Sequence, residues 1–195
     1  MAWGKNGTSV TLTGTADDMD IVDLGAKKFN NILIHKIASG AGTMLMTFNN
    51  STGQHYSDRF AYNNTQGSLT NAVSIDLAYS GSTDDFTFGH ICFISGAEKL
   101  GIFWLCDPVS SGAVAPSRLE LVVKYSPTSL TDTLDRIDLH NGTTGDYASD
   151  SNLSMLGADI TPAGAVAIKV QDGAIFYETD TNKSYVLSSS VWTEL

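Results

Sequence analysis

The chain has 195 residues, of which only 16% are charged, well below the roughly 25% that is usual for globular domains. Its net charge of −10 would repel the phosphates of DNA or RNA, so direct nucleic-acid binding is disfavoured. No apolar run reaches the roughly 20 residues that cross a membrane, and residues 1–8 lack the apolar core of a signal peptide. We therefore expect a soluble protein that is made in the cytoplasm and has no membrane partner.

Alternation of apolar and polar residues, interrupted by turn residues, predicts a series of short strands and no amphipathic helix. The expected strands are 9–13, 20–23, 28–37, 43–48, 56–62, 72–77, 86–94, 100–106, 118–125, 135–140 and 153–157. Residues 63–71 are polar, and we expect a loop there. Connections of uneven length favour a jelly-roll-like antiparallel β-sandwich over a simple meander. The fold class is thus all-β, with a first domain over residues 1–160.

The most hydrophobic predicted hairpin covers residues 86–106, and we expect it at the centre of the core. Gly89 and Gly101 lie inside its two strands. A glycine in a strand interior indicates a bulge or the close approach of a large side chain.

The sequence pattern changes after residues 159–164, where Pro162 and Gly164 mark a boundary. Short strands are expected beyond it, at 165–170, 174–179, 183–187 and 191–192. About 35 residues cannot easily hold a core of their own. We expect 161–195 to form a small C-terminal β-hairpin module that packs on the sandwich, on a copy of itself or on a partner.

Residues 47–59 join an apolar strand to an aromatic strand through a turn rich in Asn, Ser, Thr and Gly. This position indicates a hairpin junction, in which Arg59 hydrogen-bonds loop carbonyls or a neighbouring acid. Any role beyond folding is expected in contacts with other subunits or with a ligand. The expected contact residues are Asn49, Asn50, Tyr56, Arg59, Tyr62 and Trp192.

No known catalytic motif or phosphate-binding loop is present, and no histidine has a close partner at metal-ligand spacing. We therefore expect no catalytic residue, no cofactor, no metal and no enzymatic activity. Three alternatives stay open. A glycosidase could take a carboxylate pair from distant strands, the acidic run at residues 17–23 could bind Ca²⁺ although it lacks EF-hand spacing, and exposed Tyr56, Tyr62 and Tyr147 could bind a glycan.

The pattern Thr47-Phe48-Asn49-Asn50-x-Thr52-Gly53-x-x-Tyr56-x-x-Arg59 resembles a family of uncharacterised proteins from tailed phages, many of them marine. The similarity extends over nearly the whole chain. It includes residues 1–8, 26–29, 96–100, 115–118 and 136–139, together with Gly145 and Tyr147. Residues 172–195 resemble the small β-modules appended to phage fibre and decoration proteins.

The resemblance implies a non-enzymatic structural protein on the exterior of a virion. Capsid decoration or a head fibre is the first expectation, and a tail component is the second. The implied partners are further copies of the chain, with a homotrimer favoured, and other virion proteins such as the major capsid protein or tail proteins. The rival hypothesis is a glycan- or receptor-binding β-sandwich module of a tail fibre.

Overall fold

The structure is a computed structural model, and it describes residues 3–39, 43–77, 84–93, 98–108, 112–128, 133–142, 147–158, 173–178, 182–189 and 191–195. The chain packs as two compact units, residues 2–160 and residues 161–195. The described residues of both units form strands, turns and irregular segments. They contain no helix that is long and apolar enough to span a membrane.

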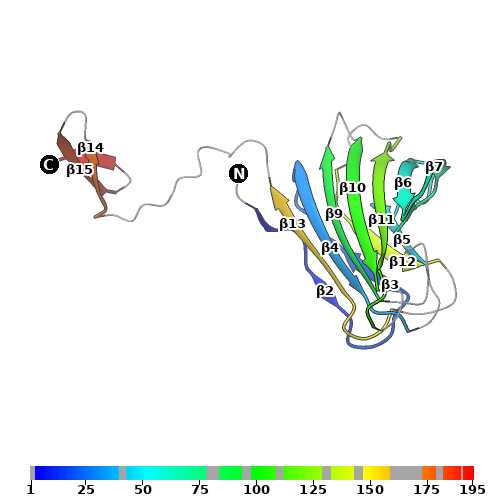
Figure 1. Cartoon of the computed structure of the whole chain (residues 1–195). Helices are drawn as coiled ribbons and strands as arrows, with labels where there is room; N and C mark the ends of the chain where they lie inside the picture. The colour runs from blue at the N-terminus through cyan, green and yellow to red at the C-terminus, as the bar shows by residue number, and fades with distance from the viewer. Residues whose placement is uncertain are drawn as a thin grey trace. The chain divides into compact units, whose positions relative to one another are not determined.

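The larger unit is built on a nine-stranded sheet, in the order β1-β13-β4-β9-β10-β11-β6-β7, with β2 also paired to β13. Its strands are β1 (Gly4–Lys5), β2 (Val10–Thr11), β4 (Phe29–Lys36), β6 (Tyr56–Tyr62), β7 (Thr65–Ala72), β9 (Asp85–Phe93), β10 (Lys99–Asp107), β11 (Ser117–Tyr125) and β13 (Asn152–Ala158). Figure 1 shows the central strands of this sheet running side by side.

A second sheet of four strands has the order β3-β12-β5-β8. Its strands are β3 (Asp18–Ile21), β12 (Ile137–Asn141), β5 (Met44–Phe48) and β8 (Ile75–Asp76). The apolar side chains of both sheets meet in one buried cluster, to which Ile34 and Phe103 contribute from the large sheet and Met46 and Leu139 from the small one. All described strand pairs within these two sheets are antiparallel. The prediction of an all-β antiparallel sandwich is confirmed.

Strand β11 shows why the sequence folds this way. Its residues alternate between buried and exposed along the whole strand. Leu119, Leu121 and Val123 point into the core, while Glu120 and Val122 lie on the outer face. Because successive side chains of a strand point to opposite faces, a period of two in the sequence fixes which residues are buried.

The prediction of a loop at residues 63–71 is wrong, because β7 occupies most of this range. The chain turns at Asn63, whose φ of 50° is left-handed and suits asparagine. It then pairs with β6 as the edge strand of the sheet. An edge strand with both faces largely in solvent needs no apolar alternation, so its polar sequence looked like a loop.

The close approach expected at Gly89 is confirmed. A Cβ atom at Gly89 would lie 2.5 Å from Cε1 of Phe103 and 2.7 Å from Cγ2 of Ile32. Phe103 is fully buried and opposes Gly89 across the β9–β10 pair. The glycine therefore leaves room for the Phe103 ring at the centre of the sandwich.

The smaller unit contains a three-stranded antiparallel sheet, with β14 (Ile175–Glu178), β15 (Lys183–Ser188) and β16 (Val191–Glu194) in sequence order. It is thus a small β-module of three strands rather than a single hairpin. The strand expected at 165–170 lies outside the described residues. Ile175 and Val191 are more than 60% exposed within the described structure, so this unit buries little of its apolar surface.

Candidate functional site

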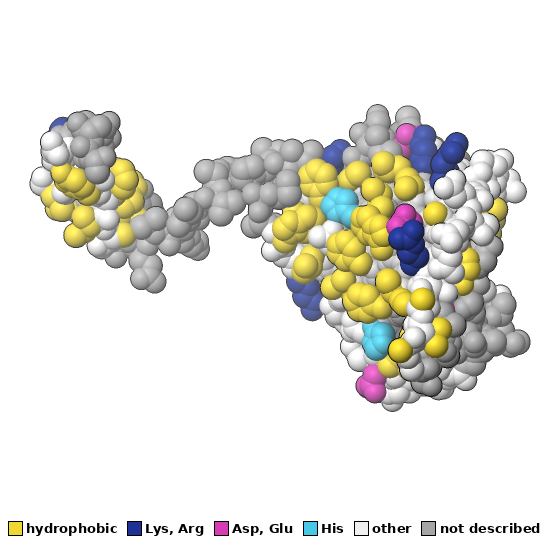
Figure 2. Space-filling view, viewed as in Figure 1, with side chains coloured by type: hydrophobic (Ala, Val, Ile, Leu, Met, Phe, Trp, Pro, Cys, Tyr) yellow, Lys and Arg dark blue, Asp and Glu magenta, His cyan; other side chains and the backbone are white. Residues whose placement is uncertain are grey.

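The outer face of the nine-stranded sheet carries large apolar side chains where a solvent-facing sheet normally carries polar ones. Six large apolar residues on this face are exposed by more than a third, which exceeds the scattered exposure normal for a soluble protein. They are Leu33, Phe86, Phe88, Trp104, Val122 and Leu156. Figure 2 shows hydrophobic side chains gathered over the middle of this unit. We call these six residues the apolar face.

An aromatic pair stands at the centre of the apolar face. Phe88 of β9 and Trp104 of β10 are direct cross-strand partners. Their rings are nearly parallel, at an angle of 19° and a centroid distance of 5.9 Å. Leu33 of β4 is the partner of Phe88 on its other side. The Phe88 ring lies against one side of Trp104, and Trp104 stays 43% exposed, so it offers a flat aromatic surface to a ligand.

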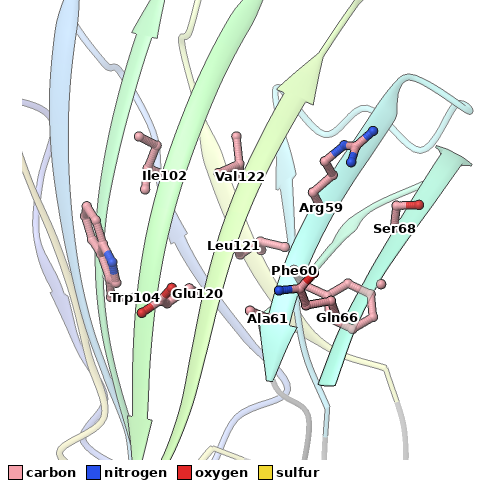
Figure 3. A pocket seen from close by; sticks show the side chains of 11 residues that line it. Arg59, Phe60, Ala61, Gln66, Ser68, Ile102, Trp104, Glu120, Leu121 and Val122 are labelled. Carbon is pink, nitrogen blue, oxygen red and sulfur yellow. The ribbon is translucent and has the colours of Figure 1, made fainter. Parts of the chain in front are cut away.

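A trough of about 580 Å³ begins at Trp104 and runs across β10, β11, β6 and β7. Its floor is largely apolar, with Ile102 and Val122 directly opposite each other on β10 and β11. Polar side chains come from β11, β6 and β7. Figure 3 shows Glu120 on β11, Arg59 on β6, and Gln66 and Ser68 on β7.

The strand register fixes this arrangement. Arg59 lies between Val122 of β11 and Ser68 of β7 in one cross-strand row. The next row holds Trp104, Glu120, Ala61 and Gln66 in strand order. An indole, a carboxylate and an amide are thereby aligned across four strands, beside a guanidinium one row away.

The described ion pair of Glu120 is weak. Its Oε1 lies 3.7 Å from Nη1 of Arg118, and both side chains are at least half exposed. Exposed pairs of this kind contribute little to stability. The Glu120 carboxylate is therefore able to exchange this contact for hydroxyl or amide donors of a ligand.

The two expected contact residues Asn49 and Asn50 build a tight turn. Both have left-handed backbones, with φ of 55° and 52°, and Ser51 N donates to Phe48 O at 2.9 Å. Positive φ at both central positions is the type I′ pattern that asparagine tolerates. Asn49 accepts hydrogen bonds from Asp135 N and Arg136 N, so the turn holds the entry to β12.

Tyr56 requires a correction, because the glycan hypothesis needed it exposed. Its side chain is 1% exposed and packs on Phe48 and Tyr125, with centroid distances of 6.0 and 4.9 Å. Its hydroxyl accepts from Phe48 N at 2.9 Å and donates to Ser51 O at 3.2 Å. Tyr147, named for the same role, is 2% exposed. Two of the three tyrosines named in the glycan alternative, Tyr56 and Tyr147, are therefore part of the core.

The remaining expected contact residues lie apart from one another. Arg59 lines the trough. Tyr62 is half-buried and donates to Ser117 Oγ at 3.2 Å, and Trp192 belongs to the smaller unit, where it contacts Phe176 edge-on. Sequence reasoning missed Phe88, Trp104, Glu120 and Gln66. One feature of the sequence could have revealed them. In residues 86–106 both odd- and even-numbered positions carry large apolar residues, and because successive side chains of a strand point to opposite faces, one set of aromatic side chains must lie outside the core.

A second depression, of about 520 Å³, lies on the small sheet. Arg136 bridges two carboxylates there: its Nη2 lies 2.7 Å from Asp20 Oδ2, and its Nε donates to Asp138 Oδ1. Asn50 N donates to Asp138 Oδ2 at 2.9 Å. Burial, followed by the Asp138 charge, raises the pKa of Asp20. These contacts fasten the 49–50 turn to β12.

The calcium alternative gains no support from the part of the chain that the structure describes. Within it, no three His, Cys, Asp or Glu side chains are grouped so that they could hold a metal ion. In the acidic run, Asp20 is instead paired with Arg136.

Comparison with known proteins leaves the family of this chain open. No family model matches, and no curated protein matches. Among solved structures, the chain is similar to a crystal structure of scytalido-glutamic peptidase with a transition state analog inhibitor. The identity is 12%, the match covers 95% of this chain and 84% of the other, and the TM-score is 0.30.

This match contradicts our expectation that the chain is not an enzyme, and we do not retain that expectation. It had rested on the absence of sequence motifs. A pair of catalytic carboxylates taken from distant strands leaves no such motif. At 12% identity and a TM-score of 0.30, the likeness assigns no activity and no residue to this chain.

Proposed function

We propose that this chain is a binding module on the exterior of a phage particle and that the trough on its large sheet binds a glycan. The observation that carries the glycan proposal is the row of Trp104, Glu120 and Gln66 across neighbouring strands. The phage setting is supported by the resemblance of residues 47–59 and of the C-terminal module to tailed-phage proteins.

The chemistry of the trough suits a sugar. A pyranose ring presents C–H groups on its faces and hydroxyls around its rim. Trp104 offers an exposed flat ring for a sugar face, while Glu120 accepts from hydroxyls and Gln66 both donates and accepts. Arg59 offers several donors in a fixed plane at the far side. An apolar floor with a few converging polar groups is the usual composition of a ligand site.

Replacing Trp104 with alanine is expected to weaken glycan binding about 10- to 100-fold, because such a loss corresponds to about 1.4–2.8 kcal/mol from a central aromatic anchor. The probe is an array of bacterial surface oligosaccharides, followed by calorimetric titration of the best ligand. Trp192→Ala is the matched control, since Trp192 is 42% exposed, nearly the same as Trp104, but lies in the smaller unit. Equal affinity of the unchanged chain and Trp104→Ala, or no array ligand for the unchanged chain, would overturn the proposal.

The extent of the apolar face favours a second function, a structural contact within the virion. Leu33, Phe86 and Leu156 are exposed but do not line the trough. A contiguous apolar surface of this kind marks protein interfaces. We propose, as the second candidate, that these residues contact another copy of the chain or another virion protein, as in a capsid decoration, head fibre or tail component.

The second candidate predicts a cyclic oligomer, with a trimer favoured, in size-exclusion chromatography with light scattering. Phe86→Ser is expected to shift the mass toward the monomer, because it places a polar group in the interface. Val114→Ser, an equally exposed apolar residue outside the paired strands, is the control. A monomeric mass for the unchanged chain at high concentration, without co-purification with phage particles, would exclude this function.

A further inference from the structure

A row of four buried polar residues crosses the inner face of the large sheet at one end. Lys36 of β4 pairs with Asp85 of β9. Cys106 of β10 pairs with Phe86, which places Asp107 beside Asp85, and Asp107 pairs in turn with Ser117 of β11. Lys36, Asp85 and Asp107 are all at most 3% exposed.

Lys36 and Asp85 are in direct contact. Nζ of Lys36 lies 2.5 Å from Oδ2 of Asp85, closer than the roughly 2.7–2.9 Å of a charged hydrogen bond. Neither atom has a hydrogen-bond partner among the described residues, so the two groups are in contact without hydrogen-bond geometry. Their side chains are 2% and 1% exposed. The next row inward is apolar apart from one hydroxyl, and consists of Ile34, Thr87, Leu105 and Leu119. All four of these residues are also buried.

The charges in this row are unequal, since it holds one ammonium and two carboxylates. The other buried lysine among the described residues is Lys99, which stands at the opposite end of β10 from Asp107 and lies over the Tyr125 ring. Two close carboxylates in a dry site cannot both stay ionised easily. Burial raises the pKa of Asp85 to about 6, although Lys36 acts in the opposite direction.

Two further buried groups show how little solvation this region offers. The hydroxyls of Thr87 and Tyr147 have no hydrogen-bond partner among the described residues. Burial raises the pKa of Tyr147, and the nearby charges of Asp18, Asp17 and Asp85 raise it further. Such surroundings offer little solvation to the charges of a buried lysine–aspartate pair.

We propose that Lys36 and Asp85 join in a covalent amide bond that links β4 to β9, with Asp107 carrying the proton. A proton first moves from the Lys36 ammonium to the Asp85 carboxylate, which leaves a neutral amine and a neutral acid. The amine lone pair then attacks Cγ of Asp85 to form the Nζ–Cγ bond. The Asp107 carboxylate takes a proton from Nζ and delivers it to the Asp85 hydroxyl.

The Cγ–O bond then breaks and one water molecule leaves. Asp107 returns to its starting form, and no oxidant, reductant or second substrate is required. Two features of the site favour the reaction. The strand register holds nucleophile and acid in contact, which replaces a bimolecular encounter, and the surrounding core keeps out the water that would reverse it. This inference does not depend on what the trough binds.

The test is the intact mass of the folded, full-length recombinant chain. We expect it to be lower than the sequence mass by one water molecule, and tryptic digestion to yield a branched peptide that joins Lys36 to Asp85. Cleavage after Lys36 should be absent. Lys36→Met and Asp85→Ala should both have the full sequence mass.

An internal control is available in the same digest. Lys124 Nζ lies 2.9 Å from Glu98 Oε1, but both side chains are about a third or more exposed, so this pair should remain unlinked. A full sequence mass for the unchanged chain, or a water loss mapped to any other pair, overturns the proposal. Asp107→Asn should leave most of the chain unlinked, and complete linkage in that variant would overturn the role of Asp107.

Discussion

Lys36→Met is expected to lower the free energy of unfolding by more than about 5 kcal/mol, the largest loss of any single substitution considered. Two terms contribute. Without Lys36 the Asp85 carboxyl stays buried with no partner from Lys36, which costs about 3–5 kcal/mol, as when one partner of a buried ion pair is removed. Opening a covalent loop of about 50 residues releases about 4 kcal/mol of loop-closure stabilisation, on the chain-entropy estimate used for disulfides. Urea denaturation followed by tryptophan fluorescence measures the change.

The double variant Lys36→Met with Asp85→Leu separates the two terms. It removes the Asp85 carboxylate together with its partner, so we expect it to recover the first loss and to remain about 4 kcal/mol below the unchanged chain. Without a covalent bond, replacing a buried ion pair by apolar residues is often neutral or stabilising. A double variant as stable as the unchanged chain would therefore contradict the amide bond.

The pH dependence of stability gives an independent control. An unlinked Asp85, with its pKa raised from 3.8 to about 6, would stabilise the fold at low pH. That contribution would be lost as pH rises through about 6, because the folded state holds the proton more tightly than the unfolded state. An amide has no such proton. We therefore expect the free energy of unfolding to change with pH in the same way for the unchanged chain and for the double variant between pH 3.8 and about 6.

Tyr56→Ala is expected to lower the free energy of unfolding by about 3–5 kcal/mol, as for other large buried aromatic residues. The ring packs between Phe48 and Tyr125, and its hydroxyl ties β6 to the end of β5. The loss would appear as a lower denaturation midpoint in urea. Any change in ligand binding by this variant would reflect unfolding rather than a lost contact in the trough.

A pair of hydroxyl deletions tests the reason for this loss. Tyr56→Phe should cost about 1–3 kcal/mol, because Phe48 N is left without its buried acceptor. Tyr147→Phe is the matched control, since Tyr147 is equally buried but its hydroxyl has no hydrogen-bond partner among the described residues. That change should be neutral or stabilising. Equal losses in the two variants would contradict the role given to the Tyr56 hydroxyl.

Much of the fold could be predicted from local patterns. The alternation in residues 118–125 predicted β11 and its buried side. Glycine at position 89 predicted a bulge or the close approach of a large side chain, and the structure identifies that side chain as Phe103. The same reasoning failed for β7, whose edge position removes the apolar signal, and for residues 86–106, where apolar residues at both parities were all assigned to the core.

The sequence by itself determined the all-β class, the strands with clear alternation and the Asn49–Asn50 turn, because each depends on neighbours in the chain. Only the tertiary structure decided which residues meet. Trp104, Glu120, Arg59 and Gln66 come from four strands, and their alignment depends on register. Lys36 and Asp85 are adjacent only because β4 lies beside β9, a pairing between strands far apart in the chain. Burial then decides their chemistry, since the same two side chains in water would remain an ordinary ion pair.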